Sequence, residues 1–378
     1  MLEAMLWSAM ALLAYIYAGY PLLAILLAKA FPRPVDRGPL RASITAIITA
    51  YNEEKHIRQK IRNVLALDYQ WELLDIIVAS DASSDATDSI VLECDAPNVK
   101  LLRVEGRLGK TACQNAAAAI ASGDILVFMD ATTMTDGNAL QAIARNFHDP
   151  SVGCVAGRLV YRARGTDATG KGGTSYWGYE TLLRMAESAL GSLIGVSGQL
   201  YAVRRSAYRP IAPDLISDFV IAMTIREQGL RTVLEPEAIC YEDTLDRADQ
   251  ELSMRIRVGL RSLYALATKR HLLNPFRFGA FAWQLGSHKL LRYLSPVFWT
   301  VALVANAALA LQGQYTVLLA AQVSILALGL LGFLPLGRFG NFRLLAQPYY
   351  FLLTNVASAV SLFRFLRGER IVTWTPLR

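Results

Sequence analysis

The sequence predicts an α/β domain with a mostly parallel sheet, joined to α-helical segments that cross a membrane. Short β-rich runs alternate with helical patterns from Ser43 onward, which is typical of parallel strands connected by covering helices. Long apolar segments lie on both sides of this alternating region. The 378 residues are also 53% hydrophobic with a mean hydropathy of +0.31, more than soluble enzymes usually carry, so part of the chain should lie in lipid.

The first apolar segment, Leu6 to Phe31, predicts an uncleaved membrane anchor. No basic region precedes it, and it is longer than the roughly 7 to 15 apolar residues of a secretory signal. Four basic residues follow its apolar core, Lys29, Arg33, Arg37 and Arg41. Because cytoplasmic flanks carry the excess of Lys and Arg, the N-terminus should face outward.

Three further segments approach the roughly 20 apolar residues of a spanning helix, namely Leu294 to Leu311, Tyr315 to Leu336 and Leu344 to Phe363. Three spans after a cytoplasmic domain would leave the C-terminus outside. The arginines after the last segment favour the inside instead. Either this segment is interfacial or re-entrant, or the positive-inside tendency is broken here.

Four strands and four helices are expected in the alternating region. The strands are ITAIIT, LLDIIVAS, VKLLRV and DILVFM, and the helices are Glu53 to Leu67, Ser84 to Glu93, Lys110 to Ala121 and one near Asn138. Ligands of such sheets bind beyond the carboxyl ends of the strands. An NAD-type Rossmann domain is not expected, because AYNEE and not G-x-G-x-x-G follows the first strand.

Beyond Val155 the pattern is less regular. Tyr176 to Leu193 predicts an amphipathic helix that either packs in the core or lies in the lipid interface, and Arg255 to Arg270 predicts a basic helix. The expected domains are an N-terminal transmembrane anchor at 1–41, a cytoplasmic α/β domain at 42–250, basic and interfacial helices at 251–292, and a C-terminal transmembrane region and tail at 293–378.

Charge and composition argue against several classes of site. The net charge is +7, but many arginines flank membrane segments and no basic helix is interleaved with base-stacking aromatics, so nucleic acid is not an expected partner. Membrane lipid and a diphosphate ligand explain the charge better. Neither a zinc site nor a redox pair is expected, since the cysteines and histidines lack paired spacing: Cys94, Cys113, Cys154 and Cys240; His56, His148, His271 and His288.

Six motifs follow one another between Ile44 and Leu260: ITAYNEE, ASDASSDAT, GRLGKTACQNAA, MDATT, ISDFVIAMTIREQG and RIRV. In this order they resemble the motif series of membrane-bound family 2 glycosyltransferases, the group that includes cellulose, chitin, hyaluronan and poly-N-acetylglucosamine synthases. The resemblance implies a GT-A-type, Rossmann-like catalytic domain at 42–250, on the cytoplasmic side of a multi-pass protein of the cell (inner) membrane. It also implies transfer of a sugar from a UDP-sugar with inversion.

Tyr51, Glu53 and Asp81 are candidates for binding the nucleotide. The tyrosine offers a stacking face, and the carboxylates can accept hydrogen bonds from ribose hydroxyls or a uracil N–H, as the resemblance also implies. A glycine-rich turn precedes Lys110, from which this side chain could reach a phosphate or the sugar. Each has a structural alternative as a buried tyrosine, a helix cap or a solvated lysine.

Asp130 ends the DILVFM strand where the family places its D-x-D, whose carboxylates hold Mg2+ or Mn2+ on the nucleotide phosphates. Thr132 replaces the second acid, and a neutral hydroxyl is a poorer ligand for a hard cation than a carboxylate. The resemblance implies a Mg2+ or Mn2+ cofactor. With Thr132 in this position, the metal rests either on Asp130, phosphate oxygens and water, or on these with another acid such as Glu242 or Asp243.

Asp218 opens the run DFVIAMTIREQG at the place of the family's general base. Such a carboxylate accepts the proton of the acceptor hydroxyl, a role worth a factor of about 10² to 10⁴, although a helix cap is the structural alternative. Arg255 and Arg257 match the arginines of the family's Q-R-x-R-W and should stabilise the leaving diphosphate. Val258 stands where the family motif has tryptophan, and this difference weakens the inference that the enzyme is processive.

The remaining site residues rest on the resemblance. It implies that Trp177, Ser197, Gly198 and Gln199 contribute to the acceptor site, and that Trp374 covers the bound nucleotide, its alternative being an interfacial anchor. Polysaccharide synthesis coupled to export is the preferred function. Alternatives are a non-processive enzyme that glycosylates a membrane lipid and a catalytically silent binding subunit. The acceptor is accordingly a glycan or a lipid, and a homo-oligomer or an export partner is left open.

Overall fold

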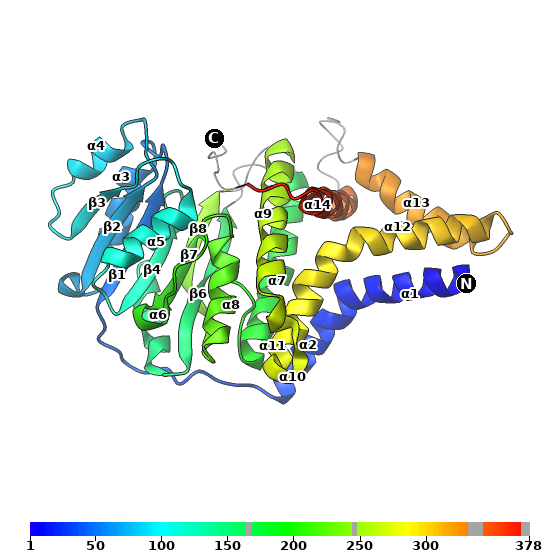
Figure 1. The fold of residues 1–378 in the computed structure, drawn as a ribbon, viewed down its shortest axis with the longest axis horizontal. Coiled ribbons are helices and arrows are strands. Elements are labelled where there is room, and N and C mark those ends of the chain that lie inside the picture. Colours follow the sequence, from blue (N-terminus) through cyan, green and yellow to red (C-terminus); the bar gives the residue numbers. More distant parts are fainter. Residues whose placement is uncertain (163–167, 244–247, 332–342, 372–378) are drawn as a thin grey trace. The chain divides into compact units, whose positions relative to one another are not determined.

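The structure, a computed structural model, describes residues 1–162, 168–243, 248–331 and 343–371 (Figure 1). These residues form two compact units. The α/β unit contains Phe31–Arg162 and Glu187–Asp243, and the helical unit contains Met1–Ala30, Ala163–Ala186 and Thr244–Arg370. The chain therefore passes between the two units several times and does not complete one before starting the other.

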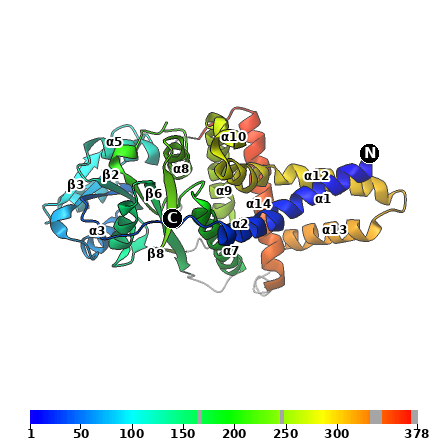
Figure 2. The ribbon, with the colours of Figure 1, turned by 90° about the horizontal axis from the view of Figure 1, so that it is seen from below.

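An eight-stranded sheet forms the centre of the α/β unit, in the order β3-β2-β1-β4-β7-β6-β8-β5. The strands are β1 Ile44–Ala50, β2 Leu74–Ser80, β3 Val99–Arg103, β4 Ile125–Asp130, β5 Met134–Thr135, β6 Val152–Arg162, β7 Leu200–Arg204 and β8 Arg231–Asp243. Every residue of β1 is buried, as expected for an apolar strand covered on both faces. Figure 2 shows the covering helices on opposite sides of this sheet.

The predicted α/β fold is confirmed in the first half of the sheet. β1 pairs in parallel with β2 and with β4, and β2 pairs in parallel with β3. The expectation of a mostly parallel sheet is too simple for the second half, where β7 runs antiparallel to both β4 and β6 and β5 runs antiparallel to β8. The sheet is mixed because β7 returns from the carboxyl end of β4 toward its amino end.

The helices of the α/β unit are α3 Ile57–Leu65, α4 Thr87–Leu92, α5 Lys110–Ile120, α6 Ala139–Ala144 and α8 Ser217–Glu227. Two of them begin three or four residues later than the patterns predict, because the chain first makes a turn at the end of a strand. Asn52, after β1, and Ala82, after β2, have positive φ angles of 53° and 54°. Both turns place polar residues at the carboxyl edge of the sheet.

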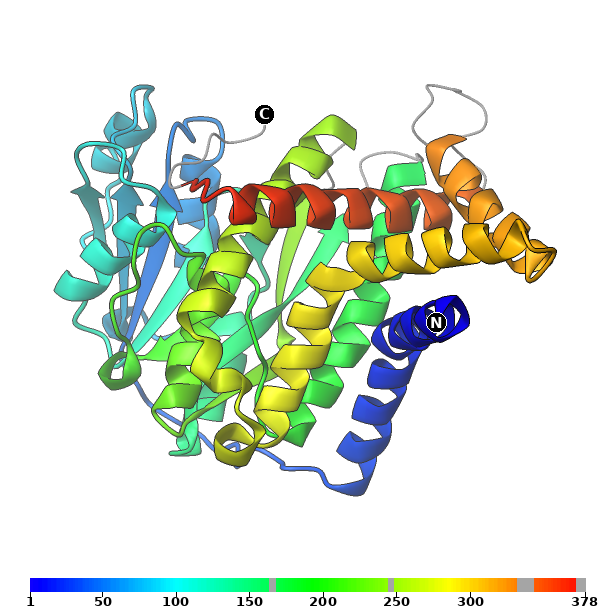
Figure 3. The same ribbon diagram turned by 45° about the vertical axis from the view of Figure 1, so that its right-hand side comes forward.

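The helical unit consists of long helices and short turns. Its helices are α1 Leu2–Ala14, α2 Tyr20–Ala30, the part of α7 Ala168–Leu190 up to Ala186, α9 Ala248–Thr268, α10 Pro275–Phe278, α11 Ala280–Gln284, α12 Leu291–Ala310, α13 Thr316–Leu331 and α14 Arg343–Leu366. Figure 3 shows α14 lying across α9 and α12, both of which it contacts.

Among the described residues of this unit, three stretches are long and apolar enough to cross a membrane, namely Leu2–Ala30, Ala280–Ala310 and Gln347–Leu366. They correspond to the first, second and fourth segments expected from the sequence. The third expected segment, Tyr315 to Leu336, is described up to Leu331, where it forms the apolar helix α13, and its last five residues lie outside the described residues. The helical unit thus fits a membrane-embedded part of the chain.

Polar side chains join the apolar helices to one another. Asn306 of α12 donates to Gln322 of α13 at 2.7 Å, and Ser295 of α12 donates to Asn355 of α14 at 2.8 Å. All four side chains are buried. Hydrogen bonds of this kind hold helices together in lipid, where the hydrophobic effect does not distinguish helix contacts from lipid contacts.

Candidate active site

The carboxyl ends of β1, β2 and β4 bring three predicted residues to one edge of the sheet. Ala50 pairs with Ser80, and Thr49 pairs with Asp130, so the residues that follow these strands are neighbours. Asp81 donates its backbone N–H to the carbonyl of Ala50 at 2.9 Å. Tyr51, Asp81 and Asp130 therefore occupy adjacent strand ends, the place where sheets of this kind bind ligands.

Asp81 stabilises the turn that leads into α5. Its two carboxylate oxygens accept hydrogen bonds from the backbone N–H of Gly109 at 3.0 and 3.2 Å, and the side chain is buried. Gly109 has a φ of +91°, a conformation that favours glycine, so this close approach of backbone to carboxylate depends on the residue type. The turn places Lys110 as the first residue of α5.

Lys110 connects the two sides of the site. Its ammonium forms an ion pair with the carboxylate of Asp130 and also donates to the carbonyl of Gly198 at 3.2 Å. A Cβ atom added at Gly198 would lie 3.1 Å from Lys110 Nζ and 2.9 Å from Asp218 Oδ2. The ammonium of Lys110 and the carboxylate of Asp218 therefore both approach the same bare backbone position. Gly198 is the residue whose lack of a side chain leaves room for them.

Asp218 enters this arrangement from the first turn of α8. Its carbonyl accepts from the backbone N–H of Val196 at 2.9 Å, which ties the start of α8 to the segment before β7. The next three residues, 197–199, are three of the four predicted for the acceptor site. Asp218, the predicted base, is thus held next to residues 197–199 by a backbone hydrogen bond and by the close approach of its side chain to Gly198.

Tyr51 and Glu53 lie in the turn after β1. Glu53 is buried, its carboxylate lies 2.8 Å from Nδ1 of His56, and its backbone N–H donates to the Thr87 hydroxyl at 2.8 Å. The guanidinium of Arg107 lies 4.3 Å from the centre of the Tyr51 ring. Sequence reasoning missed Arg107, whose only signal was its place in the glycine-rich turn before Lys110.

Comparison with known proteins bears directly on this arrangement. Residues 45–211, which include β1, β2, β4 and the turn at Lys110, match the family model described as glycosyl transferase family 2. The chain contains a family 2 glycosyltransferase domain. This confirms the resemblance to the family, and the first four of the six motifs lie within the matched residues.

Curated relatives of the glycosyltransferase domain are enzymes of polysaccharide and amino-sugar chemistry. Poly-beta-1,6-N-acetyl-D-glucosamine synthases of Staphylococcus aureus are 29% identical over 205 residues, which are 52% of this chain and 49% of theirs. The match therefore spans about half the length of these relatives. An N-acetylglucosaminyltransferase of Azorhizobium caulinodans is 26% identical over 349 residues, 86% of this chain and 83% of its own.

Among solved structures, a mannosyltransferase from Pyrobaculum calidifontis in complex with GDP-Man and Mn2+ is similar over nearly the whole chain. It is 25% identical, its TM-score is 0.74, and the match covers 98% of this chain and 100% of that one. The likeness therefore extends beyond the glycosyltransferase domain to the helical unit.

Two residues of the glycosyltransferase domain could hold a divalent cation. Gln199 links Glu242 to Asp130. The carbonyl of Gln199 accepts from the backbone N–H of Asp130 at 3.4 Å, and its side-chain amide donates to the carboxylate of Glu242 at 3.0 Å. Burial and the neighbouring Asp130 raise the pKa of Glu242 to about 7. Carboxylates that share one site suit a hard cation, although the described residues contain no group of three His, Cys, Asp or Glu placed for a metal.

Lys60 of α3 supports the loop after Asp130, and no sequence pattern pointed to it. Its side chain is fully buried, and its ammonium donates to the carbonyl of Thr133 at 2.8 Å and to the hydroxyl of Thr135 at 3.3 Å. Burial lowers the pKa of Lys60 to about 8. The segment that carries Thr132, the residue in place of the second acid, is thus anchored from beneath the sheet.

The other predicted site residues belong to the helical unit or lie outside the described residues. Arg255 pairs with Glu251 at 2.9 Å, and its guanidinium lies 4.6 Å from the ring centre of Tyr350. Burial lowers the pKa of Arg257. The side chains of Trp177 and Asp243 and the whole of Trp374 lie outside the described residues.

Proposed function

We propose that this chain transfers a sugar from a UDP-sugar to a growing polysaccharide, with inversion at the anomeric carbon. The single observation that carries the proposal is the approach of Asp218 and of Lys110, which pairs with Asp130, to the bare backbone at Gly198. A base, a cation and a metal-binding acid are the groups that sugar transfer from a nucleotide requires.

In the proposed reaction the acceptor hydroxyl loses its proton to Asp218 while its oxygen forms a bond to the anomeric carbon. The bond from that carbon to the diphosphate oxygen breaks, and its electron pair leaves with UDP. Lys110 donates to the oxygens of the departing diphosphate, which gain charge in the transition state. Ser197, Gly198 and Gln199 would position the acceptor beside Asp218.

A divalent cation fits this site. Asp130 and Glu242 would hold Mg2+ or Mn2+, and the bound ion would neutralise charge on the diphosphate. The Pyrobaculum mannosyltransferase, which carries Mn2+ together with its nucleotide sugar, supports this part of the proposal. Tyr51, Glu53 and Asp81 would bind the nucleoside.

In this proposal the reaction takes place at a membrane. We propose that the glycosyltransferase domain faces the cytoplasm and that the product is exported across the cell membrane, with Arg255 and Arg257 contributing to the diphosphate site. Three helices able to span a membrane support the location. The Staphylococcus aureus relatives, named as polysaccharide synthases, support the product.

The second candidate is transfer of one sugar to a membrane lipid. Two relatives that match most of this chain are named as transferases and not as synthases, which favours this alternative. Their donor sugars also differ in name, so GDP-Man belongs in the test beside the UDP-sugars.

The deciding experiment uses the full chain in nanodiscs with Mg2+ or Mn2+ and a panel of UDP-sugars and GDP-Man. Release of the nucleoside diphosphate and the mass of the product are measured. A ladder of products supports a polysaccharide synthase, and a single added sugar supports lipid glycosylation. Nucleotide binding without transfer in the wild type would support a silent binding subunit, whereas a transfer activity that Asp218→Asn abolishes excludes it.

A further inference from the structure

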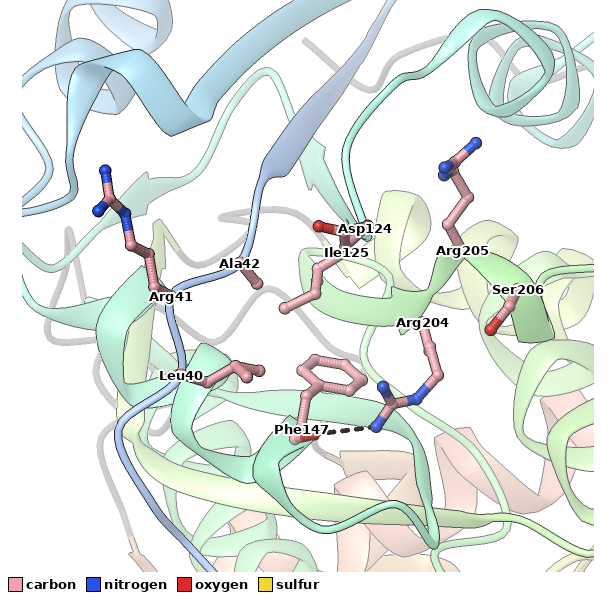
Figure 4. A pocket seen from close by; sticks show the side chains of 9 residues that line it. All are labelled: Leu40, Arg41, Ala42, Asp124, Ile125, Phe147, Arg204, Arg205 and Ser206. Atoms are coloured by element: carbon pink, nitrogen blue, oxygen red, sulfur yellow. Dashed lines mark hydrogen bonds between the residues drawn. The ribbon is translucent and has the colours of Figure 1, made fainter.

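A cavity of about 530 Å³ lies at the edge of the sheet opposite the candidate active site (Figure 4). Ala42 precedes β1, Ile125 begins β4 and Arg204 ends the antiparallel β7, so the cavity adjoins the amino ends of the two parallel strands. β1 is 7 residues long, which corresponds to roughly 20 Å between its two ends. An occupant of this cavity would therefore not contact Asp130 or Asp218.

Positive charge dominates the cavity. Three arginines and one aspartate line it, with a net charge of +2: Arg41, Arg204, Arg205 and Asp124. Arg41 and Arg205 are exposed, and neither forms an ion pair with any described residue. Figure 4 shows them on opposite sides of the opening, both extending in the same direction. Asp124 instead accepts from the Ser43 hydroxyl at 2.7 Å.

The third arginine is fixed in the wall. Arg204 donates to the carbonyls of Phe147 at 2.9 Å and of Asp149 and Val152 at 3.3 Å, and its guanidinium lies 5.5 Å from the centre of the Phe147 ring. Phe147 is buried, as are Ala42 and Ile125, so the inner surface of the cavity is apolar. The cavity thus combines a rim of unpaired cations with an apolar floor.

We propose that this cavity binds a phosphate-bearing ligand whose organic part rests on the apolar floor while its phosphate is bound at the rim by Arg41 or Arg205. Guanidinium groups bind phosphate oxygens through two parallel hydrogen bonds, which suits a dianion at a site of net charge +2. The apolar floor favours a ligand with an apolar or aromatic group next to the phosphate over inorganic phosphate. Both a soluble phosphate ester and the headgroup of an anionic phospholipid carry this chemistry.

The test measures binding of phenyl phosphate to the full chain in phosphatidylcholine nanodiscs by calorimetry, with inorganic phosphate and phenol as competitors. We expect phenyl phosphate to bind more tightly than either competitor, and the double variant Arg41→Ala, Arg205→Ala to weaken binding at least about tenfold. Arg62→Ala removes an exposed arginine of α3 and should leave binding unchanged. Asp130→Asn should also leave it unchanged, because that residue lies at the other edge of the sheet.

Nanodiscs that contain phosphatidic acid distinguish the two sources of phosphate. Competition between the lipid and phenyl phosphate assigns the cavity to a headgroup, and unchanged binding assigns it to a soluble ester. Equal binding by the wild type and the double variant, or binding that Asp130→Asn abolishes, would overturn the proposal. Arg204 is left intact in every variant because it anchors the loop at Phe147, and circular dichroism checks that each variant is folded.

Discussion

The ammonium of Lys110 pairs with the carboxylate of Asp130, the residue proposed to hold the metal, and at the same time donates to Gly198 beside Asp218. In this arrangement a cation of the protein occupies the carboxylate that a divalent cation would use. Since both cations favour the same carboxylate, Lys110 and the metal should compete for Asp130 until a diphosphate gives Lys110 another partner.

Replacing Lys110 by methionine should therefore have opposite effects on two ligands. We expect the Mn2+ affinity of the nucleotide-free protein to rise by about tenfold, because Asp130 loses its competitor, and the affinity for UDP to fall. Electron paramagnetic resonance of free Mn2+ measures the first and calorimetry the second. Lys100→Met, which changes an exposed lysine of β3, is the matched control. A lower Mn2+ affinity in Lys110→Met would contradict the competition.

Gly198→Ala should reduce turnover with little loss of stability. The new Cβ would lie 2.9 Å from Asp218 Oδ2 and 3.1 Å from Lys110 Nζ, so both groups must shift by a few tenths of an ångström. A small misplacement of a base can cost on the order of 10²-fold in rate. Gly137→Ala is the control, because a Cβ there meets nothing within 4 Å. Equal turnover numbers for Gly198→Ala and Gly137→Ala would show that Gly198 is not part of the active site.

The fully buried Lys60 predicts a pH-dependent stability. The pKa of Lys60 is about 8 in the folded protein and 10.5 in the unfolded chain. Below pH 8 the lysine is charged in both states, and burying that charge lowers the free energy of unfolding. The penalty disappears as the pH rises from 8 to 10.5. Removing this charge should therefore raise the free energy of unfolding of Lys60→Met above that of the wild type, most strongly at neutral pH and by about 1 to 3 kcal/mol. Loss of the two hydrogen bonds to Thr133 and Thr135 reduces this gain.

Thermal unfolding of both proteins at pH 7 and pH 10 measures this difference. The difference in melting temperature between Lys60→Met and the wild type should become smaller or change sign at the higher pH. Lys55→Met, in an exposed part of the turn before α3, should show no such dependence. A constant gap across this range would mean that Lys60 keeps its ordinary pKa.

The strands and the order of their acids could be predicted from local sequence. The run from Ile44 to Ala50 is apolar throughout, and the strands that end near Asp81 and Asp130 are almost as apolar, so the sheet and its functional edge follow from periodicity and from the position of each acid after a strand. The helix starts after β1 and β2 were placed too early because the turns at Asn52 and Ala82 use positive φ angles, which asparagine tolerates but does not require and which alanine rarely adopts.

Contacts between distant parts of the chain could not be predicted. Nothing local indicates that Lys60 is buried below Thr133, that Arg107 lies over Tyr51, or that the side chain of Gln199 reaches Glu242. The contact of Gln199 with Glu242 depends on the places of β7 and β8 in the mixed half of the sheet. The alternation of the first half does not extend there, so sequence reasoning offered Glu242 and Asp243 without deciding between them.

Glu242 is the residue most able to replace the acid that Thr132 lacks, and its removal should weaken metal binding. Gln199 holds the Glu242 side chain beside Asp130, so Glu242→Gln keeps the shape of the site while removing one of its two carboxylates. We expect Mn2+ affinity in the presence of UDP to fall by about 10- to 100-fold, because hard cations depend on carboxylate charge. Glu237→Gln, an exposed glutamate of the same strand β8, should leave it unchanged. If Glu242→Gln binds Mn2+ as the wild type does, the metal rests on Asp130, phosphate oxygens and water alone.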